Sequence, residues 1–203
     1  MNRLSRYFYV QLIVLVMLST SGCVNLPPST NLKSAEHAVN ILPKTIWVDE
    51  VKVTDANVKN QKVIEESLRG NITTYIQEGG YFKEANALPG IIGKDDLVLD
   101  FEFDHFIQER HLHPLSLPLS IGTLGLYMVF GGPIAVDESN LSGHLIVKDS
   151  NTLVLTRVSA EIQEDHYVSM YNSIPTGLEA RTSLVSELLT KCVNELKNNN
   201  YKH

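Results

Sequence analysis

The chain has 203 residues, with 17 basic and 23 acidic side chains and a formal net charge of −6. This length is enough for one domain with a proper hydrophobic core. The acidic balance argues against a nucleic-acid-binding protein and against electrostatic docking on anionic lipid, since both need an excess of lysine and arginine.

The first 22 residues have the three-part pattern of a secretory signal peptide. Arg3 and Arg6 supply a basic start, an apolar run follows over 7–18, and small residues fill 19–22. This order is typical of a segment that is removed after export. The apolar run of about 12 residues is too short to span about 30 Å of hydrocarbon as a helix. We therefore expect residues 1–22 to be cleaved, which leaves 15 basic against 23 acidic residues and a net charge of −8.

Cys23 follows this pattern directly. The small residues that end in Gly22-Cys23 resemble the lipobox of bacterial lipoprotein precursors, although Thr20 stands where the lipobox prefers leucine. The resemblance implies that Cys23 becomes the first mature residue and carries a diacylglycerol and an amide-linked acyl chain, which together make a durable membrane anchor. In lipoproteins that this pattern resembles, an aspartate after the cysteine typically retains the protein in the inner membrane. Val24 stands at that position here, which implies a location at the periplasmic face of the outer membrane.

The mature chain is expected to have three parts. Residues 23–45 contain two adjacent prolines and little periodicity, which predicts a lipidated N-terminus followed by a flexible tether. Residues 46–198 are expected to form a single α+β domain. Residues 199–203 are expected to be a polar tail.

The first half of this domain is predicted to run strand, helix, strand. Residues 46–53 are β-rich, and apolar residues recur at helical spacing from Ile64 to Ile76. Strict alternation over 97–108 predicts a strand that buries one face. The acidic residues at alternate positions on its other face are expected to meet water.

The second half adds a predicted hairpin, with strands over 141–147 and 153–162 around a turn at 149–152. The order is then strand, helix, strand, apolar insertion, strand, strand, helix. It predicts an α+β fold with a mixed or antiparallel sheet of about four strands and two amphipathic helices on one face. The layout is similar to small periplasmic lipoprotein domains, such as those that activate peptidoglycan synthases, or to the amino-terminal domain of the Tol-system propeller protein. This similarity rests on element order alone and implies no function.

The last element is predicted to be a long helix. Thr176 and Glu179 match a capping box at its start. Cys192 lies on its apolar stripe, which indicates a buried thiol. Acylation of Cys23 would leave this thiol without a disulfide partner.

An apolar insertion separates the two halves of the domain. Between Arg110 and Asp137 there is no lysine, arginine, aspartate or glutamate, and prolines and glycines interrupt the stretch. Three interpretations are open: a buried loop or short helix that finishes the core, a membrane-dipping element or partner groove with an exposed apolar surface, and a spanning helix. Residues 115–134 are the part through which we expect an envelope protein partner to bind.

Histidines near one predicted strand end are the candidate metal ligands. His111 and His113 would share a face of an extended chain, with His105 nearby, but no definite third ligand follows from the sequence. Catalytic and phosphate-binding motifs are missing, so we expect no catalytic residue, no cofactor and no enzyme. The expected function is a non-enzymatic, lipid-anchored envelope lipoprotein that acts as a binding or accessory component. The alternative is a periplasmic small-ligand or metal-binding module that uses the three histidines.

Overall fold

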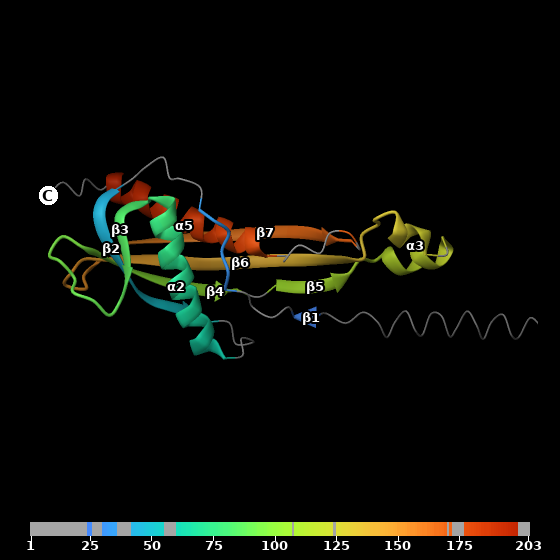
Figure 1. Ribbon diagram of the computed structural model, residues 1–203, viewed down its shortest axis with the longest axis horizontal. Helices are drawn as coiled ribbons and strands as arrows, with labels where there is room; N and C mark the ends of the chain where they lie inside the picture. The colour runs from blue at the N-terminus through green and yellow to red at the C-terminus, as the bar shows by residue number, and fades with distance from the viewer. Residues whose placement is uncertain are drawn as a thin grey trace, which may run out of the picture. The chain divides into compact units, whose positions relative to one another are not determined.

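The computed structural model describes residues 24–25, 30–35, 42–54, 60–106, 108–123, 125–169, 171 and 177–198. The expected signal peptide, Cys23 and the expected polar tail lie outside these ranges. The elements follow one another along the chain as drawn in Figure 1. They are β1 (Val24–Asn25), β2 (Leu42–Val53), α2 (Gln61–Gly79), β3 (Phe82–Ala87), β4 (Leu97–His105), β5 (Gln108–Leu112), α3 (Ser116–Gly122), α4 (Leu126–Val129), β6 (Ala135–Lys148), β7 (Val154–Val168) and α5 (Leu178–Asn198).

The chain divides into two compact units, where the sequence predicted a single domain. Unit one takes its described residues from 1–26, 109–138 and 165–176, and unit two takes its own from 27–108, 139–164 and 177–203. β6 contributes residues to both units. No local pattern marks the division, because buried and less buried residues alternate along β6 without a break.

Unit two is built on a mixed β-sheet. β2 pairs in parallel with β3 and with β4, and β4 pairs antiparallel with β6, where Leu99 lies opposite Val147. Parallel neighbours need a crossover connection, and α2 supplies it between β2 and β3. The α+β class is confirmed, but the described residues contain seven strands instead of about four. β3 was not predicted, because its buried and exposed residues do not alternate and its sequence therefore shows no strand pattern.

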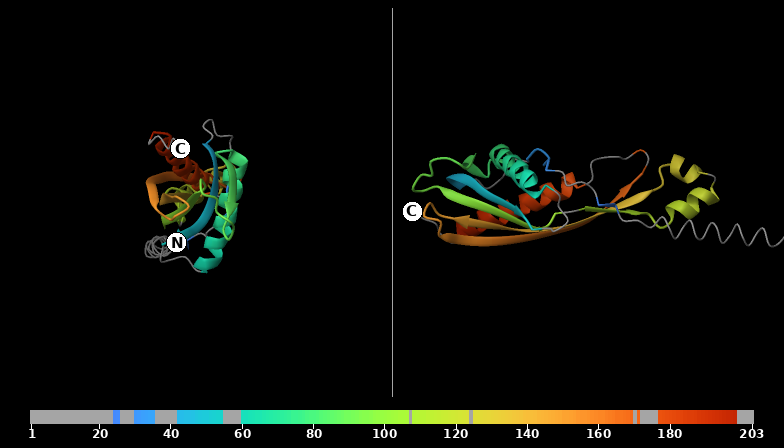
Figure 2. Two further views of the ribbon diagram at one scale, coloured as in Figure 1. Left: turned by 90° about the vertical axis from the view of Figure 1, so that its left-hand side faces the viewer. Right: turned by 90° about the horizontal axis from the view of Figure 1, so that it is seen from below.

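The core of unit two lies on one face of this sheet and is closed by two helices. Alternate residues of the strands point into it, and α2 and α5 cover it (Figure 2). Leu68, Ile72 and Ile76 come from α2, while Leu184, Leu188, Cys192 and Leu196 come from α5. The prediction that Cys192 is a buried thiol is confirmed.

Residues 30–35, which the sequence assigned to a flexible tether over 23–45, are part of unit two and contact its helices, and residues 42–45 of the same range belong to β2. The side-chain amide of Asn71 donates to the backbone oxygen of Thr30 at 2.7 Å. The backbone N–H of Lys33 donates to the hydroxyl of Thr182 at 2.9 Å. Hydrogen bonds to helix side chains leave no apolar periodicity in the sequence, so these contacts were not predictable from it.

Candidate functional site

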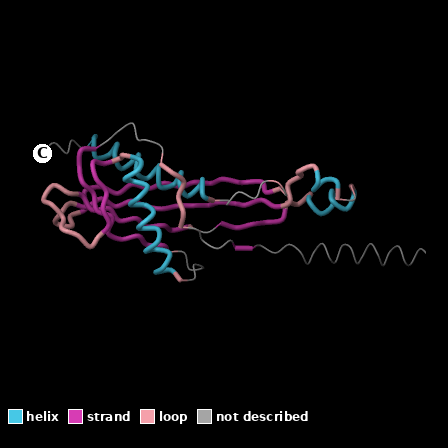
Figure 3. The backbone as a smooth tube through the Cα atoms, viewed as in Figure 1, coloured by secondary structure: helices cyan, strands magenta, loops and turns pink. Residues whose placement is uncertain are grey.

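Residues 115–134 of unit one fold into two short helices. α3 has 7 residues and α4 has 4, and the two pack against each other (Figure 3). Gly125 and Gly131 have φ angles of +86° and +81°, a left-handed conformation that glycine adopts without strain. Helices of this length do not fit the spanning-helix interpretation. Within the described ranges, no helix has the length and hydropathy needed to cross a membrane.

Most apolar side chains of this segment face solvent. Phe130, which directly follows α4, is 84% exposed, and Leu126 and Val129 of α4 are 55% and 54% exposed. Nine of the thirteen large apolar side chains that are exposed in the described part of the chain belong to unit one. The buried-loop interpretation is wrong for this segment, because Ser116 is the one described residue of α3 and α4 that is buried. We call the exposed side chains of Leu112, Leu115, Leu119, Ile121, Leu126, Val129 and Phe130 the apolar surface.

The polar groups of the same segment bond to one another. The hydroxyl groups of Ser120, Thr123 and Tyr127 donate to backbone oxygens within it at 2.5, 2.6 and 3.2 Å. The backbone N–H of every residue from 126 to 132 also donates to an oxygen of the segment. The segment therefore needs no outside partner for these groups, and the surface that it presents is apolar.

Charged side chains lie on β5, which leads into the segment, and on β6, which leads out of it. Nε and Nη2 of Arg110 lie 2.5 and 2.8 Å from the two carboxylate oxygens of Asp137. The side chain of Asp137 is fully buried, and its hydrogen bond raises the pKa of Arg110. Nε2 of His111 lies 3.4 Å from Glu109 and 3.7 Å from Glu138. β5 and β6 thus carry the charged groups, and the helices between them carry none.

Two tyrosines at the end of β7 and just after it also contact this region of unit one. The hydroxyl of Tyr171 donates to the backbone oxygen of Val129 at 2.7 Å. The ring of Tyr167 meets the ring of His113 edge-on, with centroids 5.9 Å apart. Both tyrosines are more than half exposed. A ring that ends in a hydroxyl suits a border between apolar and polar surroundings.

The start of the expected mature chain belongs to the same unit. β1 pairs antiparallel with β5, with Val24 opposite Arg110 and Asn25 opposite Glu109. Cys23 itself lies outside the described residues. Consecutive Cα atoms are about 3.8 Å apart, so the expected lipidation site is one residue away from a strand paired with β5.

The three histidines predicted as candidate metal ligands take part in other arrangements. His105 is exposed at the end of β4 in unit two. In unit one, Nδ1 of His113 accepts a hydrogen bond from the backbone N–H of Leu115 at 3.3 Å, while His111 lies beside two glutamates. Across the described residues, no three His, Cys, Asp or Glu side chains are grouped so that they could hold a metal ion.

A buried polar cluster in unit two was missed at the sequence level. Arg181 is 2% exposed, and its Nη2 donates to Oε1 of Gln108 at 3.2 Å. The guanidinium lies 5.4 Å from the ring centroid of Phe106, and its Nε has no hydrogen-bond partner in the described structure. Burial lowers the pKa of Arg181 to about 10, so the side chain is still charged at neutral pH. The available signal was a basic residue on an apolar stripe, three positions before Leu184.

The acidic residues of β4 are paired with bases. Glu102 lies 3.1 Å from Nη2 of Arg157, and Asp100 contacts Nζ of Lys148. Asp100 is buried, so the expectation that all these acids meet water is wrong for it. Cross-strand pairing with a lysine makes this burial tolerable.

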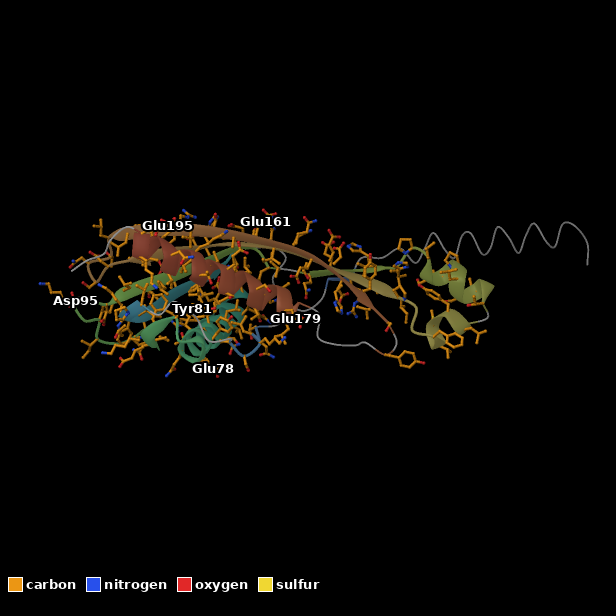
Figure 4. All side chains as sticks on the ribbon, turned by 90° about the horizontal axis from the view of Figure 1, so that it is seen from above. Glu78, Tyr81, Asp95, Glu161, Glu179 and Glu195 are labelled. Atoms are coloured by element: carbon orange, nitrogen blue, oxygen red, sulfur yellow. The ribbon has the colours of Figure 1, made fainter. Side chains whose placement is uncertain are left out.

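A depression of about 760 Å³ runs along α5 in unit two. Glu179 and Glu195 mark the two ends of α5 in Figure 4, and Tyr81 lies between them. The hydroxyl of Tyr81 is 3.1 Å from that of Ser186, and Lys33 pairs with Glu179 at 3.3 Å. Tyr81 is buried, but the Lys33–Glu179 pair is exposed, and exposed ion pairs beside serine and threonine side chains are typical of a solvated helix face.

Comparison with known proteins gives weak structural similarities. No protein-family model and no curated protein matches this chain. The chain is similar to a structure described as a homologue of the neuraminyllactose-binding hemagglutinin from Helicobacter pylori, with a TM-score of 0.40, 10% identity, and coverage of 84% of this chain and 92% of that one. It is also similar to a minor lipoprotein from Acinetobacter baumannii, with a TM-score of 0.33, 9% identity, and coverage of 78% and 94%. TM-scores below 0.5 assign the chain to no family.

Proposed function

We propose that this chain is a non-enzymatic lipoprotein of the bacterial cell envelope. In this proposal the lipid on Cys23 anchors it at the periplasmic face of the outer membrane, where it acts as a binding or accessory component. The observation that carries the proposal is the apolar surface, which is exposed and free of charge. Exposed apolar patches on folded domains mark contact sites, so residues 115–134 are the contact segment.

The chemistry of the segment supports contact and not catalysis. Its leucine, isoleucine, valine and phenylalanine side chains supply no acid, base or nucleophile. The hydroxyl groups of Ser120, Thr123 and Tyr127 are engaged in hydrogen bonds inside the segment. The Arg110–Asp137 pair fixes the strands on either side, which holds the surface in place.

Photocrosslinking in intact cells tests whether this surface has a partner. A photoreactive amino acid is placed at Phe130, which is 84% exposed in unit one, or at Ile91, which is 92% exposed in unit two. We expect a defined adduct, with protein or with lipid, from position 130 and none from position 91. Equal adduct formation at the two positions, or none at either, would contradict the proposed contact.

A further inference from the structure

We propose that the apolar surface of unit one inserts into the interfacial layer of a lipid bilayer, as a second membrane contact beside the acylated Cys23. This inference rests on the proposed function and names the partner of its contact segment. The occupant is the bilayer itself. A protein partner or a second copy of this chain is an outcome that would overturn the inference.

The internal hydrogen bonding of the segment is the first argument for lipid. Hydrocarbon offers no partner to an N–H or hydroxyl group, so a segment that enters it must satisfy such groups by itself. The hydroxyl groups of Ser120, Thr123 and Tyr127 and the backbone N–H groups of 126–132 meet this requirement. A protein interface, by contrast, normally exchanges about one hydrogen bond across each 100–200 Å².

The order of residue types around the surface is the second argument. The helices carry no charge, whereas ionised groups begin on the adjoining strands at Arg110 and Asp137. Tyr167 and Tyr171 contact the same region and are largely exposed. Aromatic rings with a polar end concentrate at the membrane interface, and charged groups stay outside the hydrocarbon. The apolar helices thus match the acyl-chain region of a bilayer, the tyrosines match its interface, and the charged strands match the water outside it.

The position of β1, which directly follows the expected lipidation site, is the third argument. Val24 lies opposite Arg110 on β5, the strand that leads directly into the apolar segment. The lipid on Cys23 and the apolar surface therefore belong to one unit, and both can reach the same bilayer. Since α3 and α4 are too short to span it, they would lie within the interface.

Fluorescence quenching by brominated lipid tests the inference on the full lipidated protein. The protein is reconstituted into vesicles of phosphatidylethanolamine and phosphatidylglycerol that carry brominated acyl chains. Phe130→Trp places a reporter on the apolar surface, and Ile91→Trp is the matched control in unit two. The native Trp47, the one tryptophan of the chain, is hydrogen-bonded to Asp96 at 2.8 Å and gives the background signal. Both substitutions replace exposed side chains, so folding should be unaffected.

We expect brominated vesicles to quench most of the fluorescence that the Phe130→Trp substitution adds. The fluorescence of Ile91→Trp should be the same in brominated and unbrominated vesicles. Equal quenching of both, or of neither, would overturn the inference. An emission shift at position 130 that depends on protein concentration without vesicles would point to a second copy and would also overturn it. If position 130 stays unquenched but crosslinks to a protein in cells, the bilayer inference fails and the proposed function stands.

Discussion

Val24 lies opposite Arg110 in the antiparallel pairing of β1 with β5. Arg110 in turn holds the buried carboxylate of Asp137 on β6 through two hydrogen bonds. Residue 24, next to the expected lipidation site, and both strands that flank the apolar segment are therefore joined through Arg110. This arrangement explains how a single unit can present the expected lipid anchor and an apolar surface together.

Acylation of Cys23 predicts a specific mass. The mature wild-type protein should be heavier than residues 23–203 alone by a diacylglycerol and an amide-linked acyl chain, and Cys23→Ser should carry neither. Mass spectrometry of protein purified from membranes checks this. An unmodified mass for the wild type, or a lipid-sized mass increment that Cys23→Ser also carries, would refute the lipoprotein assignment.

Substitution at Phe130 should leave folding stability unchanged, because this side chain contacts solvent over most of its area. We expect Phe130→Ala to alter the free energy of unfolding by less than about 0.5 kcal/mol. Phe103 is fully buried in unit two, and Phe103→Ala should cost about 3–5 kcal/mol. Urea denaturation followed by circular dichroism compares the two variants. Losses of similar size would mean that the Phe130 side chain is part of a core.

The Arg110–Asp137 pair should contribute more to the free energy of unfolding than an exposed ion pair does. Removing the guanidinium leaves a buried carboxylate without its bidentate partner, so Arg110→Ala should cost about 3 kcal/mol or more. Arg157→Ala, which breaks the more exposed pair with Glu102, should cost less than about 1 kcal/mol. The free energies of unfolding of the two variants measure this difference. Equal costs would show that burial of Asp137 does not control the stability of unit one.

Cys192 predicts a pH dependence of stability. Burial raises the pKa of its thiol from 9.0 to about 12. Above pH 9 the unfolded chain loses this proton while the folded chain keeps it, so the stabilisation is complete below pH 9 and is lost as the pH rises toward 12. The difference in free energy of unfolding between wild type and Cys192→Ala should therefore fall by about 1.4 kcal/mol from pH 8 to pH 10. A difference that stays constant over this range would contradict the burial of the thiol.

Local periodicity was enough to predict the α+β class, α2, β4, the β6–β7 hairpin and α5. It failed where polar residues occupy inward positions. β6 begins at Ala135, six residues before the predicted start, because its inward positions hold Asp137 and Ser139 instead of apolar residues. Buried and less buried residues alternate along the whole of β6, but polar and apolar residue types do not alternate over its first part.

The candidate site shows a similar limit. The absence of charge between Arg110 and Asp137 identified the segment, yet the same composition fits a buried loop or an exposed surface. Exposure depends on what the rest of the chain places beside the segment, which is a tertiary property. Arg181 is the reverse case: it is buried, but the sequence alone would place a charged residue at the surface. The pairing of β1 with β5 involves two residues and left no periodic signal.

Spin-label accessibility at position 130 tests membrane contact most directly. Cys192 is buried and Cys23 would be acylated, so Phe130→Cys offers one reactive thiol for the label. On the lipidated protein in vesicles, we expect this label to be accessible to oxygen and shielded from a water-soluble nickel complex. A label at Ile91→Cys should show the opposite preference. Free access of the nickel complex to position 130 would contradict insertion of the apolar surface into the bilayer.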